Sequence, residues 1–192
     1  MKYIISGTDR PGSNTMKVAK HVQSIYKNLG EHVEIIDLQE MKAPLHENLQ
    51  YGTTSDGMKP YMEKVLHSEG LIVICPEYNG SMPGILKYFI DHLKYPDSFE
   101  FRPVCFVGLG GMFGALRPVE HLQQIFGYRN AYIYPERVFL MNVFKILDAN
   151  GAITDDVCNQ LLIKQAKGFK KFTEALTAFA IDANATIAAK KK

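Results

Sequence analysis

The sequence predicts an α/β fold with a five-stranded, parallel, doubly wound sheet and helices on both faces. Apolar runs of strand length alternate with segments of helical periodicity along the chain, and such strict alternation is typical of parallel sheets. The central runs are apolar without interruption, as in strands that are buried on both faces. The predicted strands cover, in order, residues 3–5, 33–38, 71–75, 104–108 and 131–134.

Each predicted strand is followed by a helix, and three of these helices have a start or stop signal. Gly30 is placed to end the first helix, Pro83 can begin the third, and Thr154-Asp155-Asp156 caps the last. Residues 39–57 show no clear period, and we expect a long loop there, which is uncommon unless it is functional. The predicted helices cover residues 16–29, 58–68, 83–93, 116–126 and a final stretch to about residue 180.

Composition indicates one domain and argues against two classes of partner. A chain of 192 residues that is 46% hydrophobic can bury a sizeable core. We expect residues 1–182 to form a single domain and residues 183–192 a flexible tail, since small residues there precede the basic run 190–192. The alternative for that run is a basic anchor. The net charge of +2 is too small to indicate nucleic acid or a membrane surface as a partner.

Cysteine usage indicates a reducing, cytoplasmic setting. Cys75, Cys105 and Cys158 are far apart and form no CxxC pair, which argues against a zinc or iron–sulfur site. The six histidines also lack metal-ligand spacing, and we expect them to be surface or packing residues. The apolar run in residues 3–5 is too short for a signal peptide.

The first loop, residues 6–15, has the chemistry of a phosphate site. Hydroxyl and backbone N–H donors at a helix N-terminus bind anions, and Arg10 adds a charged fork of donors. The loop matches neither GxxxxGK[ST] nor GxGxxG, so a monophosphate fits it better than a polyphosphate. The alternative is a capped helix start with Arg10 in solvent. The side chains that could donate are Thr8, Ser13, Asn14 and Thr15.

Two further loops follow the third and fourth strands, at the sheet edge where doubly wound folds bind ligands. In the second loop, residues 76–84, Tyr78 offers a flat face to a ring, and Asn79 and Ser81 offer hydrogen bonds to polar ring edges. The third loop, residues 108–117, has four glycines within seven residues, which suggests a close approach of backbone to something flat. The alternatives are an ordinary strand–turn–helix connection and a loop that is simply flexible.

Together the three loops resemble the NADPH-dependent FMN reductase family, which has a flavodoxin-like fold and includes quinone, azo-dye and chromate reductases. The resemblance covers roughly residues 1–180. Its motifs are Gly7-Thr8-x-Arg10-x-Gly12-Ser13, then Pro76-Glu77-Tyr78-Asn79-x-Ser81-x-Pro83-Gly84-x-Leu86-Lys87-x-x-Ile90-Asp91, and then the glycine-rich third loop.

The resemblance implies a cofactor, a reaction and an assembly. The cofactor is FMN, NADPH or NADH is the co-substrate, and hydride passes through the flavin N5 to a small acceptor such as a quinone or a flavin. No protein nucleophile or base is required, because the cofactor carries the chemistry. Members form homodimers or homotetramers, with helix 83–93 at the subunit interface. The implied cofactor-binding residues are Thr8, Arg10, Ser13, Asn14 and Thr15 for the phosphate, Pro76, Glu77, Tyr78, Asn79 and Ser81 for the ring and ribityl chain, and Gly110, Gly111 and Gly114 near the ring.

Three positions depart from the family pattern. Asp9 places a negative charge in the phosphate loop, Thr15 stands where asparagine is frequent, and His92 stands where tryptophan is frequent. We expect Asp9 to turn away from the phosphate while Arg10 and the donors of residues 13–15 face it.

Two rival functions share the predicted fold. The first is a flavodoxin-type electron carrier, although such chains are usually strongly acidic and this one has a net charge of +2. The second is a flavin-free binding or regulatory protein, to which Asp9 gives slight support. Both NADPH and NADH remain open as the co-substrate, and Arg117 is a candidate residue for selecting between them.

Overall fold

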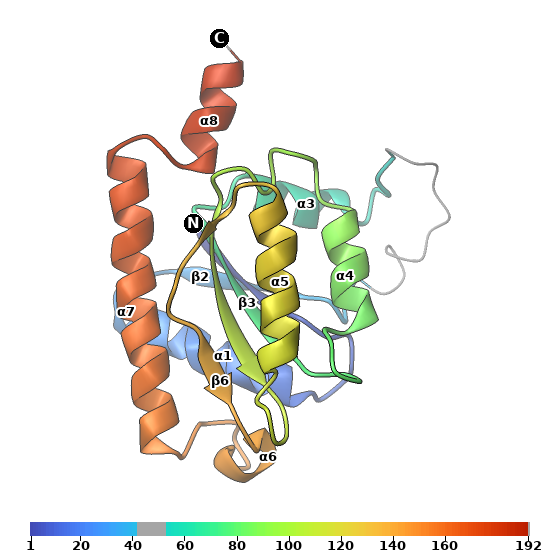
Figure 1. The fold of residues 1–192 in the computed structure, drawn as a ribbon, viewed down its shortest axis with the longest axis vertical. Coiled ribbons are helices and arrows are strands. Elements are labelled where there is room, and N and C mark those ends of the chain that lie inside the picture. The colour runs from blue at the N-terminus through green and yellow to red at the C-terminus, as the bar shows by residue number, and fades with distance from the viewer. Residues whose placement is uncertain (42–52, 192) are drawn as a thin grey trace.

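The computed structural model describes residues 1–41 and 53–191, and its centre is a parallel sheet (Figure 1). The strand order is β2-β1-β3-β4-β5, and β6 also pairs with β4. Every pairing is parallel. This confirms the predicted doubly wound α/β fold. The strands are β1 Lys2–Ser6, β2 Val33–Asp37, β3 Gly70–Pro76, β4 Pro103–Leu109, β5 Tyr132–Ile133 and β6 Val138–Leu140.

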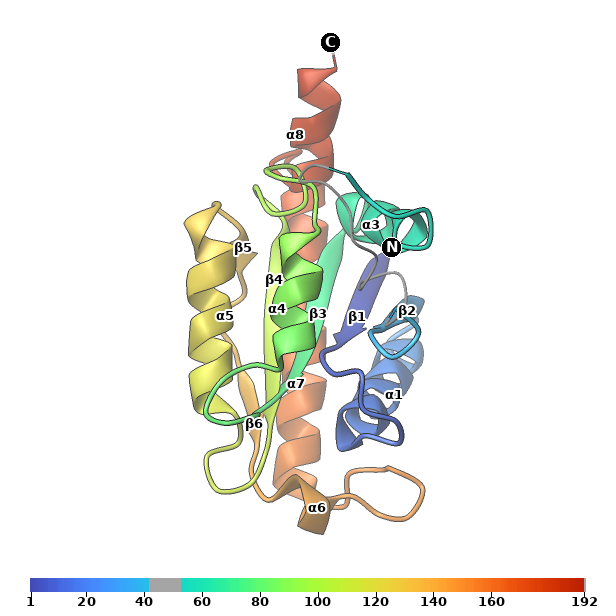
Figure 2. The same cartoon turned by 90° about the vertical axis from the view of Figure 1, so that its right-hand side faces the viewer.

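Helices cover both faces of the sheet, and each face has its own apolar core (Figure 2). On one face α1 and α7 pack on residues such as Ile72 and Val107. On the other face α3, α4 and α5 pack on residues such as Val73 and Phe106. β3 and β4 are buried along their whole length because side chains on both of their faces meet helices. These helices are α1 Asn14–Asn28, α3 Lys59–Leu66, α4 Gly84–Asp91, α5 Leu116–Tyr128 and α7 Asp156–Ala178.

The carboxyl ends of β1, β3 and β4 lie at one edge of the sheet. Ser6 at the end of β1 pairs with Ile74 of β3, and Pro76 at the end of β3 pairs with Leu109 of β4. The three loops singled out in the sequence leave the sheet at these points. The register therefore brings together segments that are about 100 residues apart in the chain.

The fifth strand position is divided into two pieces, which the sequence did not predict. β5 pairs with the amino half of β4, at Pro103 and Val104, and β6 pairs with its carboxyl half, from Val107 to Leu109. Pro135 lies between the pieces, and proline cannot donate to a strand ladder. The short helix α6, Val143–Ile146, then follows β6 at the carboxyl edge.

The predicted flexible tail is wrong for most of its length, because residues Ala183–Lys190 form helix α8. The Asp182 carboxylate caps this helix by accepting the N–H groups of Asn184 and Ala185. At its far end Lys190 pairs with Asp97 and Glu100, at 3.1 and 2.9 Å. The cap starts the helix, and the two ion pairs dock it near the amino edge of the sheet.

The predicted long loop 39–57 lies partly outside the described residues, which omit 42–52. Met41 and Met58 on either side of that gap are fully buried. Among the described helices, none is long and apolar enough to cross a membrane.

Candidate cofactor site

The first loop combines a tight exit from β1 with a capped helix start. A side chain at Gly7 would meet the Ile74 carbonyl oxygen at 2.6 Å, so only glycine fits there. Gly12 has φ +63°, in the left-handed region that favours glycine. Ser13 is the N-cap of α1, and its hydroxyl accepts the Met16 N–H at 3.1 Å. The loop thus contains the capped helix start that the sequence offered as an alternative, and it also leaves first-turn N–H groups of α1 for an anion.

The first and second loops touch through Thr8 and Tyr78. The Thr8 hydroxyl lies 2.8 Å from the Tyr78 hydroxyl, and the Arg10 guanidinium carbon lies 4.5 Å from the centre of the Tyr78 ring. Thr8 is buried, whereas Arg10 is exposed. An aromatic ring under a guanidinium restrains the guanidinium but leaves its N–H donors unpaired. Arg10 therefore keeps donors available for an anion beside the helix start.

The second loop is a tight hairpin that presents its middle residues outward. Tyr78 and Ser81 exchange two backbone hydrogen bonds, of 2.9 and 3.1 Å, around Asn79 and Gly80. Both middle residues have positive φ, 51° and 78°, as in the Asn-Gly turns that join two short antiparallel segments. Pro76 is the last residue of β3 and is buried. The residues that the resemblance assigns to the flavin ring therefore sit on a defined turn.

Helix α5 braces this second loop from the side. His121 Nδ1 lies 2.9 Å from the Ser81 hydroxyl, and Arg117 pairs with Glu77 at 3.5 Å. Arg117 and His121 are four residues apart, so they project from the same face of the helix. The His121 contact was not predicted, since nothing in the spacing of Ser81 and His121 indicates that the two residues meet.

The third loop is fixed by the segment that follows β6. The Gly110 N–H donates to the Leu140 carbonyl, and the N–H groups of Asn142 and Val143 donate to Gly111 and Gly110. A side chain at Gly110 would lie 3.5 Å from the Glu77 side chain, so the second and third loops are in contact. This support was not predicted, because neither β6 nor α6 was expected from the sequence.

At the end of the third loop two consecutive residues, Gly114 and Ala115, have positive φ, of 56° and 66°. A side chain at Gly114 would meet Met141 and Phe139 at 3.0 to 3.3 Å. A close approach of the backbone therefore explains why residue 114 is a glycine. The atoms that it approaches belong to Phe139 and Met141, however, and not to a ligand.

The remaining predicted phosphate residues differ in exposure. Asn14 is half-buried, whereas Thr15 is only 2% exposed. Asp9 is half-buried and lines a hollow of about 510 Å³ together with Tyr78 and residues 83–85 and 88 of the next helix region. Asp9 thus lines a hollow between the first loop and the start of α4.

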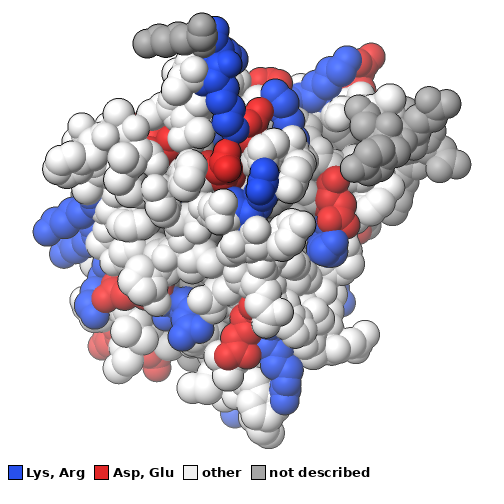
Figure 3. All heavy atoms as spheres, turned by 45° about the horizontal axis from the view of Figure 1, so that its top comes forward, with Lys and Arg blue, Asp and Glu red and all other residues white. Residues whose placement is uncertain are grey.

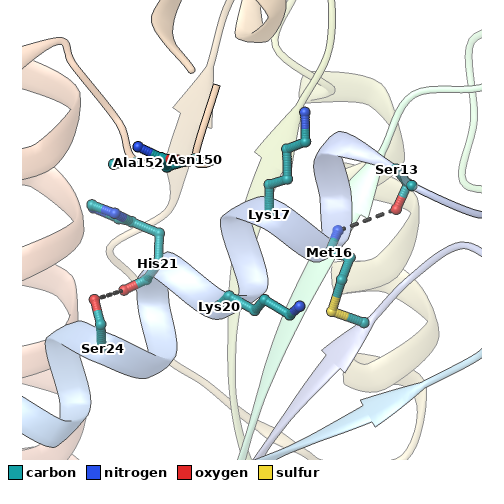
Figure 4. A pocket seen from close by; sticks show the side chains of 10 residues that line it. Ser13, Met16, Lys17, Lys20, His21, Ser24, Asn150 and Ala152 are labelled. Carbon is teal, nitrogen blue, oxygen red and sulfur yellow. Dashed lines mark hydrogen bonds between the residues drawn. The ribbon is translucent and has the colours of Figure 1, made fainter. Parts of the chain in front are cut away.

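A second hollow, of about 440 Å³, runs along the outer side of α1 (Figure 4). Gly12 and Ser13 lie at one end of it, and residues 150–152 form its opposite wall. His21 extends toward Asn150, while Lys17 and Lys20 extend in different directions. The hollow includes no residue of the second or third loop, so it does not have the parts that a flavin ring requires.

None of the three thiols is prepared for nucleophilic chemistry. Burial raises the pKa of Cys75 and of Cys105, and burial together with the nearby Asp155 carboxylate raises the pKa of Cys158 to about 11. At neutral pH these groups are protonated and therefore weak nucleophiles. Within residues 1–41 and 53–191, no group of three His, Cys, Asp or Glu side chains is arranged to hold a metal ion.

The structure brings together the predicted site residues around one edge of the sheet. Thr8, Arg10 and Tyr78 are in mutual contact, and Glu77 touches both α5 and the third loop. An anion site at a helix start thus lies next to a turn with an aromatic side chain and a third loop with little side-chain bulk. This arrangement suits an elongated ligand that has a phosphate at one end and a flat ring at the other.

Comparison with known proteins agrees with that arrangement. An FMN-dependent NADPH-azoreductase of Staphylococcus aureus is 34% identical over 128 residues, which are 64% of this chain and 66% of the relative. The chain therefore aligns with slightly less than two thirds of that relative. A flavoenzyme NAD(P)H:acceptor oxidoreductase from Paracoccus denitrificans has a TM-score of 0.73 at 21% identity, covering 91% of this chain and 97% of that one.

A second solved structure, an oxidoreductase from Corynebacterium diphtheriae, has a TM-score of 0.69 at 18% identity and covers 91% of this chain and 96% of that one. At these identities the two structures show the shared flavodoxin-like fold. The sequence itself matches the family described as NADPH-dependent FMN reductase over residues 3–145. The chain belongs to the NADPH-dependent FMN reductase family.

Proposed function

We propose that this chain is an FMN-dependent NAD(P)H oxidoreductase, which passes a hydride from a nicotinamide to bound FMN and then reduces a small acceptor such as a quinone or a flavin. The observation that carries the proposal is the 2.8 Å contact between Thr8 and Tyr78, which joins the anion site of the first loop to the turn of the second. Membership of the family and the azoreductase relative support the same activity.

For the FMN phosphate we propose Thr8, Arg10, Ser13, Asn14 and Thr15. The Ser13 hydroxyl accepts the Met16 N–H, and its own proton remains available for a phosphate oxygen. The Thr15 side chain is buried, so we assign its backbone N–H rather than its hydroxyl to the phosphate. With Asp9 on the α4 side and Arg10 above Tyr78, the charges of the loop fit a bound anion.

For the ring and ribityl chain we propose Pro76, Glu77, Tyr78, Asn79 and Ser81, with Gly110, Gly111 and Gly114 alongside. When bound, FMN supplies the hydride-accepting and electron-donating chemistry. The residues of this chain bind and orient the cofactor, and the overall reaction NADPH + H⁺ + quinone → NADP⁺ + hydroquinone requires no protein nucleophile. The brace from His121 to Ser81 and from Arg117 to Glu77 keeps the second loop in place.

We also propose a cytoplasmic homodimer or homotetramer. An apolar hollow of about 430 Å³ between α4 and α5, lined by residues such as Ile90 and Tyr128, supports an interface that includes α4. His92 caps the end of α4, and its ring lies 4.6 Å from that of Tyr88. Light scattering of the purified protein measures the mass, and a monomer would contradict this part of the proposal.

The visible spectrum of the purified protein and its NADPH oxidation test the function. We expect flavin absorbance, and NADPH oxidation when FMN and a quinone are added. Absence of both would refute the proposal. Stopped-flow mixing with NADPH or NADH then compares the two donors. Slow reduction by both, with flavin bound, would instead indicate an electron carrier.

A further inference from the structure

Exposed apolar side chains gather around the third loop, at the carboxyl edge of the sheet. We call this set the apolar rim. Gathered apolar surface on an otherwise polar protein marks a binding site more often than single exposed residues do. Its members are Met112, Phe113, Leu116, Met141 and Phe144, all more than 40% exposed.

Phe113 differs from the other aromatic ring of the rim, Phe144, in its connection to the second loop. The Arg117 guanidinium carbon lies 4.9 Å from the centre of the Phe113 ring, and the same guanidinium pairs with Glu77 at 3.5 Å. Arg117 therefore links the Phe113 ring to Glu77, one of the residues proposed to hold the flavin.

The backbone on both sides of Phe113 is fixed, although its side chain is half exposed. On one side Gly111 accepts the Asn142 N–H at 2.8 Å, and on the other side the Phe113 carbonyl accepts the Leu116 N–H at 3.0 Å. An apolar ring on a restrained backbone loses little conformational entropy when a ligand packs against it. Phe113 is therefore suited to contact a ligand rather than to fill the protein core.

We propose that Phe113 determines acceptor specificity, by packing its ring against flat aromatic acceptors. The inference rests on the proposed function and adds to it a residue that selects among acceptors, favouring those with a flat aromatic face. Aromatic pairs prefer offset or edge-to-face contacts and gain free energy beyond simple burial. Met112 beside Phe113 is flexible and polarizable, which lets the rim adapt to acceptors of different outline.

The test separates the two half-reactions of the FMN-loaded protein by stopped flow. NADPH first reduces wild type, Phe113→Ala, Phe113→Leu and Phe113→Tyr, and each reduced form is then mixed with 1,4-naphthoquinone or with ferricyanide, which has no aromatic face. We expect Phe113→Ala and Phe113→Leu to slow oxidation by naphthoquinone roughly 5-fold, the size of one lost aromatic pair. Phe113→Tyr keeps the wild-type rate, and ferricyanide oxidises all four forms equally.

A binding measurement gives a readout that does not depend on turnover. Equilibrium dialysis of 2-naphthol, a planar aromatic that accepts no hydride, should show an affinity for Phe113→Ala weaker by the same factor, roughly 5-fold. Phe179→Ala is the matched control, because Phe179 is 77% exposed at the end of α7 that lies away from the carboxyl edge (Figure 1). It should leave every value unchanged.

Two outcomes would overturn the role of Phe113. One is an unchanged naphthoquinone rate in Phe113→Ala, and the other is an equal loss with naphthoquinone and ferricyanide. Failure of the proposed function looks different, because NADPH would then not reduce the wild-type flavin at all.

Discussion

Arg102 at the amino edge of the sheet is held in a different way from Arg10 and Arg117 at the carboxyl edge. At the amino edge Arg102 is fully buried, and its guanidinium donates to the carbonyls of Leu66, Ser68 and Asp97 and to the Asn184 side chain. At the carboxyl edge Arg10 and Arg117 are exposed and rest on aromatic rings. The amino edge uses its cations to hold the fold together, whereas the carboxyl edge leaves donors available for a ligand.

Lysines at the amino edge, like Arg102, are used to hold the fold together. Lys2, which is 4% exposed, pairs with Glu31 at 2.7 Å, and Lys170 of α7 reaches the same carboxylate at 2.9 Å. Figure 3, which tilts the top of the molecule forward, shows acidic and basic side chains next to one another on this face. One pair of opposite charges there is Lys190 of α8 with Glu100.

The largest expected effect comes from removing the buried cation. Arg102→Met removes the guanidinium donor from the carbonyls of Leu66, Ser68 and Asp97, of which Ser68 keeps the Asn184 amide, and each buried group left unpaired costs free energy. We expect a loss of about 4 kcal/mol in the free energy of unfolding, measured by urea denaturation. The burial that makes this guanidinium structural also lowers its pKa, to about 10.

The exposed Arg137 provides the matched control for Arg102, since its guanidinium donates to the Gln123 side chain and lies over the Phe139 ring while remaining in solvent. Arg137→Met should change stability by less than about 0.5 kcal/mol. Flavin affinity of the folded fraction should be unchanged in Arg102→Met. If FMN affinity fell together with stability, the amino edge would contribute to cofactor binding as well as to the fold, contrary to the proposed contrast.

The second prediction concerns the carboxyl edge. Arg10→Ala removes a proposed phosphate donor, and we expect FMN to bind more weakly by about 2 kcal/mol, the value of a hydrogen bond to a charged group. Stability without flavin should hardly change, because Arg10 is exposed. Titration with riboflavin, which lacks the phosphate, is the control. A similar loss with both ligands would show that Arg10 acts through Tyr78 and not through the phosphate.

A third prediction uses pH to examine the ion pairs of the amino edge. Partial burial opposes ionisation of Glu31, but hydrogen bonds from Lys2 and Lys170 outweigh it and hold the pKa of this carboxyl below 4.5. Since the folded pKa is the lower one, the stabilisation is complete above pH 4.5 and is lost as the pH falls through the folded value.

Glu31→Gln should therefore lower the free energy of unfolding at pH 7 by about 1.5 kcal/mol, the value of a charged hydrogen bond. The difference from wild type should shrink steadily below pH 4.5, as measured by urea denaturation across the acid range. A difference independent of pH would mean that Glu31 stabilises by packing rather than by charge.

The parts of the molecule that the sequence predicted depend on local patterns. The apolar runs of β3 and β4 and the Asn-Gly turn of the second loop can each be recognised within a few neighbouring residues. The contact between Thr8 and Tyr78 cannot, because it joins residues 70 positions apart and depends on strand order. The same is true of His121 and Ser81, which meet only because α5 packs beside β3.

Helix α8 and strand β6 were missed for a different reason, which is the lack of a strong pattern. Residues 183–190 are mostly small and contain one large apolar side chain, so they form no recognisable helix face. The signal for α8 was its N-cap, Asp182, but the small residues that follow were interpreted as a tail. β6 has only three residues and follows Pro135, so its apolar run was too short to be recognised.

The smallest expected effect compares two helix caps, one at each edge. Ser13 caps α1 beside the proposed phosphate, and Asp182 caps α8 near the amino edge. Ser13→Ala should cost about 1 kcal/mol of stability, the usual value of a lost N-cap, and Asp182→Ala a comparable amount. Only Ser13→Ala should also weaken FMN, because its hydroxyl proton is the one proposed to reach a phosphate oxygen. Isothermal titration with FMN and with riboflavin separates the two effects, since the cap is lost for both ligands and the phosphate contact only for FMN. Equal FMN affinity in the two variants would make Ser13 a helix cap and nothing more, and the phosphate would then rest on Arg10, Thr8 and the backbone N–H groups of α1.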